Sequence, residues 1–292
     1  MAAVGLALTS ALLFGAMSVA LRMALERDPD VALGTLATAA TALGVALVAA
    51  AAEEPTRGLH LGAAWPFVLA GLLSPGAAQI LVTFAIRDAG SSRVSMVFGL
   101  APLVSVTIAL VFLGEPARVP LLIGAVLVVA GGVMLARERG RPAHLNRIGL
   151  VYAFAGATLF AIRDNLVRHF AVDRTAVPPA AAAAAALLGG TLLIALWAGS
   201  GAARGGGARP GINRRWLPFV PAGLLFGGSY VALFEAYFRG RVTVVAPLVA
   251  IESLAGVALS ALLLSKSELV GKKLVLCAAL IVAGGALIGA FR

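Results

Sequence analysis

The sequence predicts an all-α integral membrane protein of ten transmembrane helices, arranged as two inverted five-helix repeats. Three observations support this fold class. The 292 residues are 61% hydrophobic and only 12% charged, with a mean hydropathy of +1.00, whereas soluble domains average about 25% charged residues. Ten mostly apolar segments reach the length of about 20 residues that a bilayer crossing requires. The two halves of the chain also repeat one another.

The expected spans are separated by polar stretches or by stretches that contain Pro and Gly. Most of these loops are short, which makes consecutive helices antiparallel neighbours. Only 200–215 is long, and its glycines are typical of a flexible connector. The spans are expected at 3–25, 31–51, 64–86, 94–114, 119–136, 147–170, 176–199, 216–238, 242–265 and 270–291.

The internal repeat is clearest where residues 66–76 (PFVLAGLLSPG) match residues 218–228 (PFVPAGLLFGG) at an offset of 152. Two further matches extend it along both halves. They are FGAMSVALR at 14–22 over FAIRDNLVR at 160–168 with an offset of 146, and AGG at 130–132 over AGG at 283–285 with an offset of 153.

Five helices in each half imply that the halves insert with opposite orientation, because an odd number of crossings inverts the second copy. Inverted repeats of this kind are typical of transporters, whose two states arise when the halves exchange conformations. We therefore expect a first five-helix repeat at 1–142 and a second at 143–292.

The charges are distributed as they are around membrane spans. The formal net charge is +10, but the Lys and Arg residues form short clusters between apolar runs, so we expect no nucleic-acid partner. One set of alternate loops carries 14 of these residues and the opposite face carries seven. The positive-inside rule then predicts that the richer face is cytoplasmic and that both termini lie outside.

The order of several short motifs resembles the EamA domain of the drug/metabolite transporter superfamily. The resemblance covers essentially the whole chain and departs from the pattern at LLLSKSE (262–268), where only the Glu of LGE remains. It implies ten helices around a central cavity and the export or exchange of small metabolites, without fixing a substrate. The motifs are APL at 101–103, FLGE at 112–115, GxxLxxxGGxxL at 124–135, VAPL at 245–248 and AGGALI at 283–288.

Four charged residues inside the spans are candidates for a substrate site, because each such charge costs about 3 kcal/mol or more at the bilayer centre. They are Arg163, Asp164, Glu235 and Glu252. The end of the sixth span, the end of the eighth and the start of the ninth lie on one side of the membrane, so the four share one half of the bilayer. We expect them to converge on the cavity, with Arg163 paired to Glu252 or Glu235.

Structural explanations of these charges stay open. Asp164 and Arg168, like Glu235 and Arg239, are spaced i,i+4 with the acid first and could pair along one helix face. Arg163 and its acidic partner could equally form a buried ion pair without any role in transport.

Uncharged polar residues complete the predicted site. Asn165 follows the charged pair in the sixth span, and Gln79 is the strongly polar side chain in the middle of the third. Pro75, in Ser74-Pro75-Gly76, should kink the third span, because proline removes a backbone hydrogen bond. Tyr230 and Tyr237 in the eighth span could contact substrate or pack in the core.

The predicted function is transport of a small organic metabolite across the inner (plasma) membrane by alternating access. An amino acid or related zwitterion is favoured, because Arg163 offers a partner for a carboxylate and Glu235 or Glu252 a partner for an ammonium group. Glu252 is also a candidate for coupling to protons. Alternatives are efflux of lipophilic cations, a membrane-embedded enzyme and a structural membrane subunit.

The sequence contains no recognisable catalytic or cofactor motif, and its three histidines fall at different loops. We therefore expect no enzymatic activity, no metal and no cofactor. The expected partners are the lipid bilayer and a small-molecule substrate, and either a monomer or a homodimer is compatible with the sequence.

Overall fold

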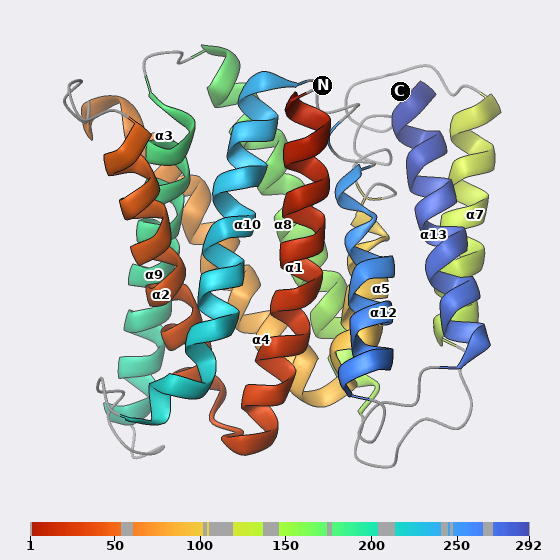
Figure 1. Cartoon of the computed structure of the whole chain (residues 1–292), viewed down its shortest axis with the longest axis horizontal. Helices are drawn as coiled ribbons and strands as arrows, with labels where there is room; N and C mark the ends of the chain where they lie inside the picture. The colour runs from red at the N-terminus through yellow and green to blue at the C-terminus, as the bar shows by residue number, and fades with distance from the viewer. Residues whose placement is uncertain are drawn as a thin grey trace.

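The computed structural model describes residues 2–53, 61–101, 104, 119–136, 146–173, 177–203, 214–240, 245, 248–264 and 271–291. Within these ranges the secondary structure is helical and contains no strand. The helices run along a common axis, and the two ends of the chain lie on the same face of the bundle (Figure 1).

Helices of the first half begin close to the predicted positions. The helices are α1 (Ala2–Arg27), α2 (Val31–Glu53), α3 (Leu61–Gly71), η1 (Leu72–Ala77), α4 (Ala78–Ala89), α5 (Ser91–Phe98) and α7 (Val119–Ala136). Those of the second half are α8 (Ile148–Asp173), α9 (Pro179–Ala203), η2 (Arg214–Phe219), α10 (Val220–Arg239), α12 (Glu252–Leu263) and α13 (Lys272–Phe291).

Six helical segments of the described chain are long and apolar enough to cross a membrane. They confirm a multi-pass membrane protein, whereas the full set of ten spans stays a prediction. The motif FLGE and most of the predicted span 94–114 lie outside the described residues. The six segments are Ala2–Arg27, Val31–Glu53, Ala63–Ala89, Ile148–Ala171, Pro179–Ser200 and Arg214–Arg239.

The predicted kink in the third span is confirmed. Between α3 and α4 the helix widens into the π-helical segment η1, where Ser74 leaves helical geometry with φ −148° and ψ 119°. Pro75 lies in this segment and is buried, as is Gly76. Irregular backbone at membrane depth is tolerated where it is buried in protein, as it is here.

Most helix contacts join the first half of the chain to the second. Helix α1 packs on α10 and α12, α2 on α9 and α10, α4 on α8, α5 on α12 and α8, and α7 on α13. Small residues allow several of these close approaches. A Cβ atom at Gly71 in α3 would meet the backbone of Ala186 in α9, and one at Gly223 in α10 would meet Thr38 and Thr41 in α2.

The contact between α7 and α13 is symmetric. Each helix is the counterpart of the other in the repeat, and each contributes the same kind of surface. A Cβ atom at Gly131 would meet Ile281 and the carbonyl oxygen of Cys277, whereas one at Gly284 would meet Val128 and the carbonyl oxygen of Gly124. An offset of 153 connects each residue of the first contact to its counterpart in the second. Two equivalent surfaces therefore meet reciprocally, as they do at a two-fold interface.

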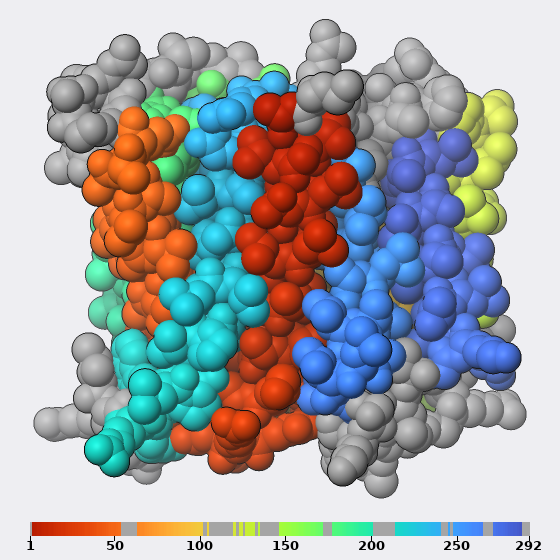
Figure 2. Space-filling view, viewed as in Figure 1, coloured from red at the N-terminus to blue at the C-terminus, as the bar shows by residue number. Residues whose placement is uncertain are grey.

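The outer surface carries large apolar side chains, as a lipid-facing surface requires. On the face in Figure 2, α2, α10, α1, α12 and α13 lie side by side. Val48 is 70% exposed, Leu262 is 76% exposed and Leu12 is 55% exposed. Charged side chains are scarce along the middle of these helices, so the bilayer can solvate this surface.

Candidate functional site

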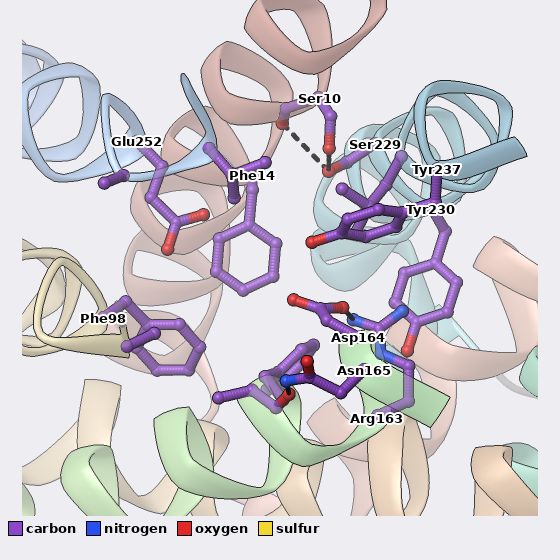
Figure 3. A pocket seen from close by; sticks show the side chains of 16 residues that line it. Ser10, Phe14, Phe98, Arg163, Asp164, Asn165, Ser229, Tyr230, Tyr237 and Glu252 are labelled. Atoms are coloured by element: carbon purple, nitrogen blue, oxygen red, sulfur yellow. Dashed lines mark hydrogen bonds and ion pairs between the residues drawn. The ribbon is translucent and has the colours of Figure 1, made fainter. Parts of the chain in front are cut away.

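A cavity of about 60 Å³ lies between α1, α5, α8, α10 and α12. A volume of this size has room for a few water molecules or for part of a small polar ligand. Its walls come from both halves of the chain, which meet around it (Figure 3). Six predicted site residues are among those that line it: Arg163, Asp164, Asn165, Tyr230, Tyr237 and Glu252.

The cavity lies toward one membrane face. Its residues belong to the first half of α1, the second half of α10 and the first turn of α12. Helices α1 and α10 are antiparallel, since a Cβ atom at Gly240 would meet Ala3, whereas Arg215 bonds Asp28 just beyond the other end of α1. The cavity is therefore nearer to the face that holds the start of α1.

Arg163 is the central charge of the site. Its side chain is 1% exposed, and its Nη2 atom lies 3.2 Å from Oδ1 of Asp164. Three aromatic rings surround the guanidinium group, with their centres at 4.6 Å (Tyr230), 5.2 Å (Phe160) and 5.7 Å (Phe234) from Cζ. Cation–π attraction strengthens when the cation is removed from water, so these rings stabilise a buried charge.

The partners of Asp164 and Arg163 differ from those expected. Asp164 pairs with its neighbour Arg163 and also interacts with Tyr237, whereas Arg168 donates a hydrogen bond to the carbonyl oxygen of Tyr237 at 2.7 Å. The alternative in which Asp164 and Arg168 pair along α8 is therefore not observed. Asp164 and Arg168 both interact with groups on α10 and not with each other, because α10 packs on this face of α8.

Glu252 is the second carboxylate of the cavity. It begins α12, is 5% exposed, and points toward the interior opposite Asp164 in Figure 3. It attracts Arg163 electrostatically and is repelled by Asp164, which carries the same sign of charge. No direct ion pair between Glu252 and Arg163 forms among the described residues, since Asp164 takes that position.

Glu235 lies apart from the cavity. It forms the predicted i,i+4 pair with Arg239, with 2.7 Å between Oε2 and Nη2. It also interacts with Glu53, whose carboxylate accepts a hydrogen bond from the backbone N–H of Ala180 at the start of α9. Glu235 thus belongs to a polar cluster at the end of α10, and the expected convergence holds for Arg163, Asp164 and Glu252.

Gln79 is fully buried in α4, yet it is not among the residues that line the cavity. Neither polar atom of its amide has a hydrogen-bond partner among the described residues. The sequence placed it correctly in the middle of a span but could not show which neighbours it would meet. The structure does not bring it together with the other predicted site residues.

Aromatic and hydroxyl residues of the cavity were missed from the sequence. Phe14 and Phe160 occupy equivalent repeat positions, and their rings meet at 5.7 Å. The ring of Phe98 packs against both, tilted relative to Phe14 and edge-on to Phe160. The hydroxyls of Ser10 and Ser229 lie 3.0 Å apart at the rim of the same space. The repeat alignment was the available signal, because a residue that meets its own counterpart must lie near the axis that relates the halves.

The arrangement can bind a molecule that carries a positive charge. Two carboxylates and one guanidinium line the cavity, and Asp164 already offsets Arg163, so Glu252 remains the carboxylate without a direct ionic partner among the described residues. Phe14, Phe98 and Tyr230 supply apolar and aromatic surface beside it. Within the described ranges no group of three or more His, Cys, Asp or Glu residues could hold a metal ion.

Comparisons with known proteins bear on the family and on the fold. Residues 1–137 match the EamA-like transporter family, which confirms the inferred resemblance over the first half of the chain. One solved crystal structure has a TM-score of 0.67 and 23% sequence identity, and the similarity covers 98% of this chain and 95% of the other. At that identity it establishes a shared fold. Among curated proteins, none matches the sequence.

Proposed function

Since the chain carries an EamA-like transporter domain over residues 1–137, we propose that it is a secondary transporter that moves a small organic metabolite by alternating access. The cavity between the two halves is the observation that carries this proposal. It combines buried charges, which are costly in a membrane protein and are retained mainly for function, with aromatic walls that suit an organic molecule. We place the protein in the inner (plasma) membrane.

Packing between the halves supports an arrangement as inverted repeats at 1–142 and 143–292. Exchange of the two halves converts the contact of α1 with α10 into that of α8 with α4, and the contact of α2 with α10 into that of α9 with α3. The contacts of α2 with α9, α5 with α12 and α7 with α13 are converted into themselves. Such a pairing gives a transporter two related states of similar energy.

An amino acid or related zwitterion is the substrate class that we propose. Glu252 would bind the ammonium group, since its carboxylate faces the cavity. Nε and Nη1 of Arg163 make no hydrogen bond to described residues, so they are available to a substrate carboxylate when the site rearranges. Charge-assisted hydrogen bonds of this kind are about twice as strong as neutral ones.

A lipophilic cation is the second candidate substrate. It is favoured by one observation: Asp164 and three aromatic rings already satisfy the charge of Arg163. In that case Arg163 would organise the aromatic wall and Glu252 alone would bind the ligand. The two candidates differ in what they require of Arg163.

Uptake into proteoliposomes, measured for a panel of amino acids and organic cations with and without a pH gradient, tests the proposal. For a zwitterion, both Glu252→Gln and Arg163→Lys should lower transport by about tenfold or more, because the first removes the charge that binds the ammonium group and the second removes the planar donor geometry that binds a carboxylate. For a lipophilic cation, only Glu252→Gln should do so. Arg27→Gln, an exposed charge at the end of α1, is the control.

Normal transport by both cavity variants would refute the assignment of the site. Absence of transport for every compound by the unmodified protein, in liposomes where it is folded, would contradict the proposed substrate classes. A response to the pH gradient that is lost in Glu252→Gln would identify protons as the coupling ion.

A further inference from the structure

Arg22 ties α1 to the end of α4. Its side chain is buried, and Nη1 donates hydrogen bonds to the carbonyl oxygens of Ile86 at 3.2 Å and Arg87 at 2.8 Å. Nε lies 3.1 Å from Oε1 of Glu26, one turn further along α1. Carbonyl groups near the end of a helix lack some of their partners within the helix. The carbonyl oxygen of Ile86 also accepts a hydrogen bond from the backbone N–H of Gly90, so Arg22 adds a second donor there.

Arg168 makes the corresponding bond in the second half. Its Nη1 donates to the carbonyl oxygen of Tyr237 at 2.7 Å, in the last turn of α10. Arg22 and Arg168 are equivalent in the repeat, at the offset of 146 that relates 14–22 to 160–168. At the offset of 152 that relates α4 to α10, Tyr237 corresponds to Ala85, the neighbour of Ile86. A corresponding helix-to-helix bond, with its acceptor shifted by one or two residues, is thus made in each half.

The two bonds lie at opposite membrane faces. Arg22 is near the end of α1 that adjoins Asp28 and Arg215. Arg168 binds the end of α10, where Gly240 adjoins Ala3 at the start of α1. One arginine therefore joins two helices at each face, and the cavity lies nearer to the face of Arg168.

We propose that Arg22 and Arg168 are paired latches, each of which holds one face of the transporter closed and is released when that face opens. The inference rests on the proposed alternating access and adds the residues that control it. Both latches are formed in this structure, and that of Arg22 is the more extensive. Arg22 is 5% exposed with two carbonyl bonds and an ion pair, whereas Arg168 is half-buried with one carbonyl bond.

The latch at Arg168 is connected to the cavity through Tyr237. Arg168 binds the backbone of this residue, while its ring lines the cavity and interacts with Asp164. A ligand that displaces the ring would therefore strain the bond to Arg168. A coupling of this kind requires only that the ligand binds the latched and released states with different affinity.

Thiol labelling in lipid nanodiscs tests the latches without a substrate, because both faces are then accessible to a water-soluble maleimide. The background is Cys277→Ala, which removes the single cysteine of the chain. Ser18→Cys reports on the face of Arg22, since Ser18 is buried one turn before it in α1. Ser10→Cys reports on the cavity.

Arg22→Gln should raise the labelling rate at position 18 by about tenfold and lower it at position 10, because loss of charge-assisted bonds favours the state open at that face. Arg168→Gln should shift the two rates in the opposite directions. Arg22→Lys keeps the charge but not the paired bonds, so its rates should fall between those of Arg22→Gln and the unmodified protein. It also serves as the test should Arg22→Gln fail to fold. Arg27→Gln should change neither rate.

Unchanged rates in folded Arg22→Gln and Arg168→Gln would overturn the proposal. Equal increases at both positions would also overturn it, since they would mean that the arginines merely hold the bundle together. Because labelling needs no ligand, opposite shifts in a protein that transports none of the compounds tested would preserve the latches and refute only the proposed substrate.

Discussion

The guanidinium carbon of Arg163 lies 4.6 Å from the centre of the Tyr230 ring, while the hydroxyl of Tyr230 lies 3.4 Å from that of Ser74 in the broken third span. Tyr230→Leu should destabilise the protein by about 1–3 kcal/mol, because a buried cation loses an aromatic face. Tyr230→Phe keeps the ring, so its loss of stability should be less than half of that caused by Tyr230→Leu. Thermal unfolding in detergent compares the two variants.

Equal losses of stability in Tyr230→Leu and Tyr230→Phe would show that the hydroxyl, and not the ring, stabilises the protein. Ser74→Ala provides the check, since it removes the other partner of the hydroxyl contact. If the ring carries the effect, Ser74→Ala should resemble Tyr230→Phe.

Gln79→Leu should raise the stability of the protein by about 1–3 kcal/mol, the cost of an unsatisfied buried polar group. Both polar atoms of Gln79 lack hydrogen-bond partners among the described residues. Transport should persist, because Gln79 does not line the cavity. Unfolding and transport assays on the same variant separate the two effects, and loss of transport with normal stability would restore Gln79 to the substrate site.

Gly71→Ala should destabilise the protein by about 1–3 kcal/mol, since the added Cβ would collide with the backbone of Ala186 across the contact of α3 with α9. Gly44→Ala is the matched control, because no atom lies within 4 Å of the new Cβ and the residue faces outward. Helix propensity favours alanine at that position by about 1 kcal/mol. Comparable midpoints of unfolding for the two variants would contradict the close packing of α3 on α9.

Asp28 makes stability depend on pH at the face opposite the cavity. The hydrogen bonds from Arg215, at 2.7 and 2.9 Å, hold the pKa of Asp28 below its ordinary value of 3.8. A lowered pKa in the folded state means that the unfolded chain binds the proton more readily, so the bridge stabilises fully above that ordinary value. Its contribution is lost as the pH falls through the lowered pKa.

Asp28→Asn should therefore lower the midpoint of thermal unfolding at neutral pH. At acidic pH the midpoints of the unmodified protein and the variant should approach each other, because protonation of Asp28 breaks the bridge in the unmodified protein. Differential scanning fluorimetry between about pH 2 and pH 6 measures this difference. Arg215→Gln should reproduce the result, because it removes the same bridge. A difference that stays constant over the whole range would exclude the bridge as its cause.

The long apolar helices and the charges within them could be predicted from the sequence because both depend on composition. The inward faces of the helices could not. Lipid and protein core are both apolar, so an amphipathic pattern that marks the buried face of a soluble helix is absent. Phe14 and Phe98 therefore looked like any other apolar residues, although they line the cavity.

Pairing of the charges was predictable only within one helix. Of the two pairs that i,i+4 spacing allowed, Glu235 with Arg239 forms and Asp164 with Arg168 does not. At Asp164 the neighbouring α10 decides the outcome, because its last carbonyl groups compete for Arg168 and its tyrosine competes for Asp164. Contacts across helices of this kind depend on helix rotation, which spacing along the chain does not determine.

The proposed division into inverted repeats at 1–142 and 143–292 has a consequence for how each repeat could exist alone. Helices α1, α2, α4, α5 and α7 bury their main contact faces against helices of the other half. A first half synthesised alone would leave those faces uncovered. It could cover them only by associating with a second copy inserted upside down, with Gly131 of each copy against the α7 helix of the other. The fused chain makes that antiparallel association permanent and allows each orientation to acquire its own residues.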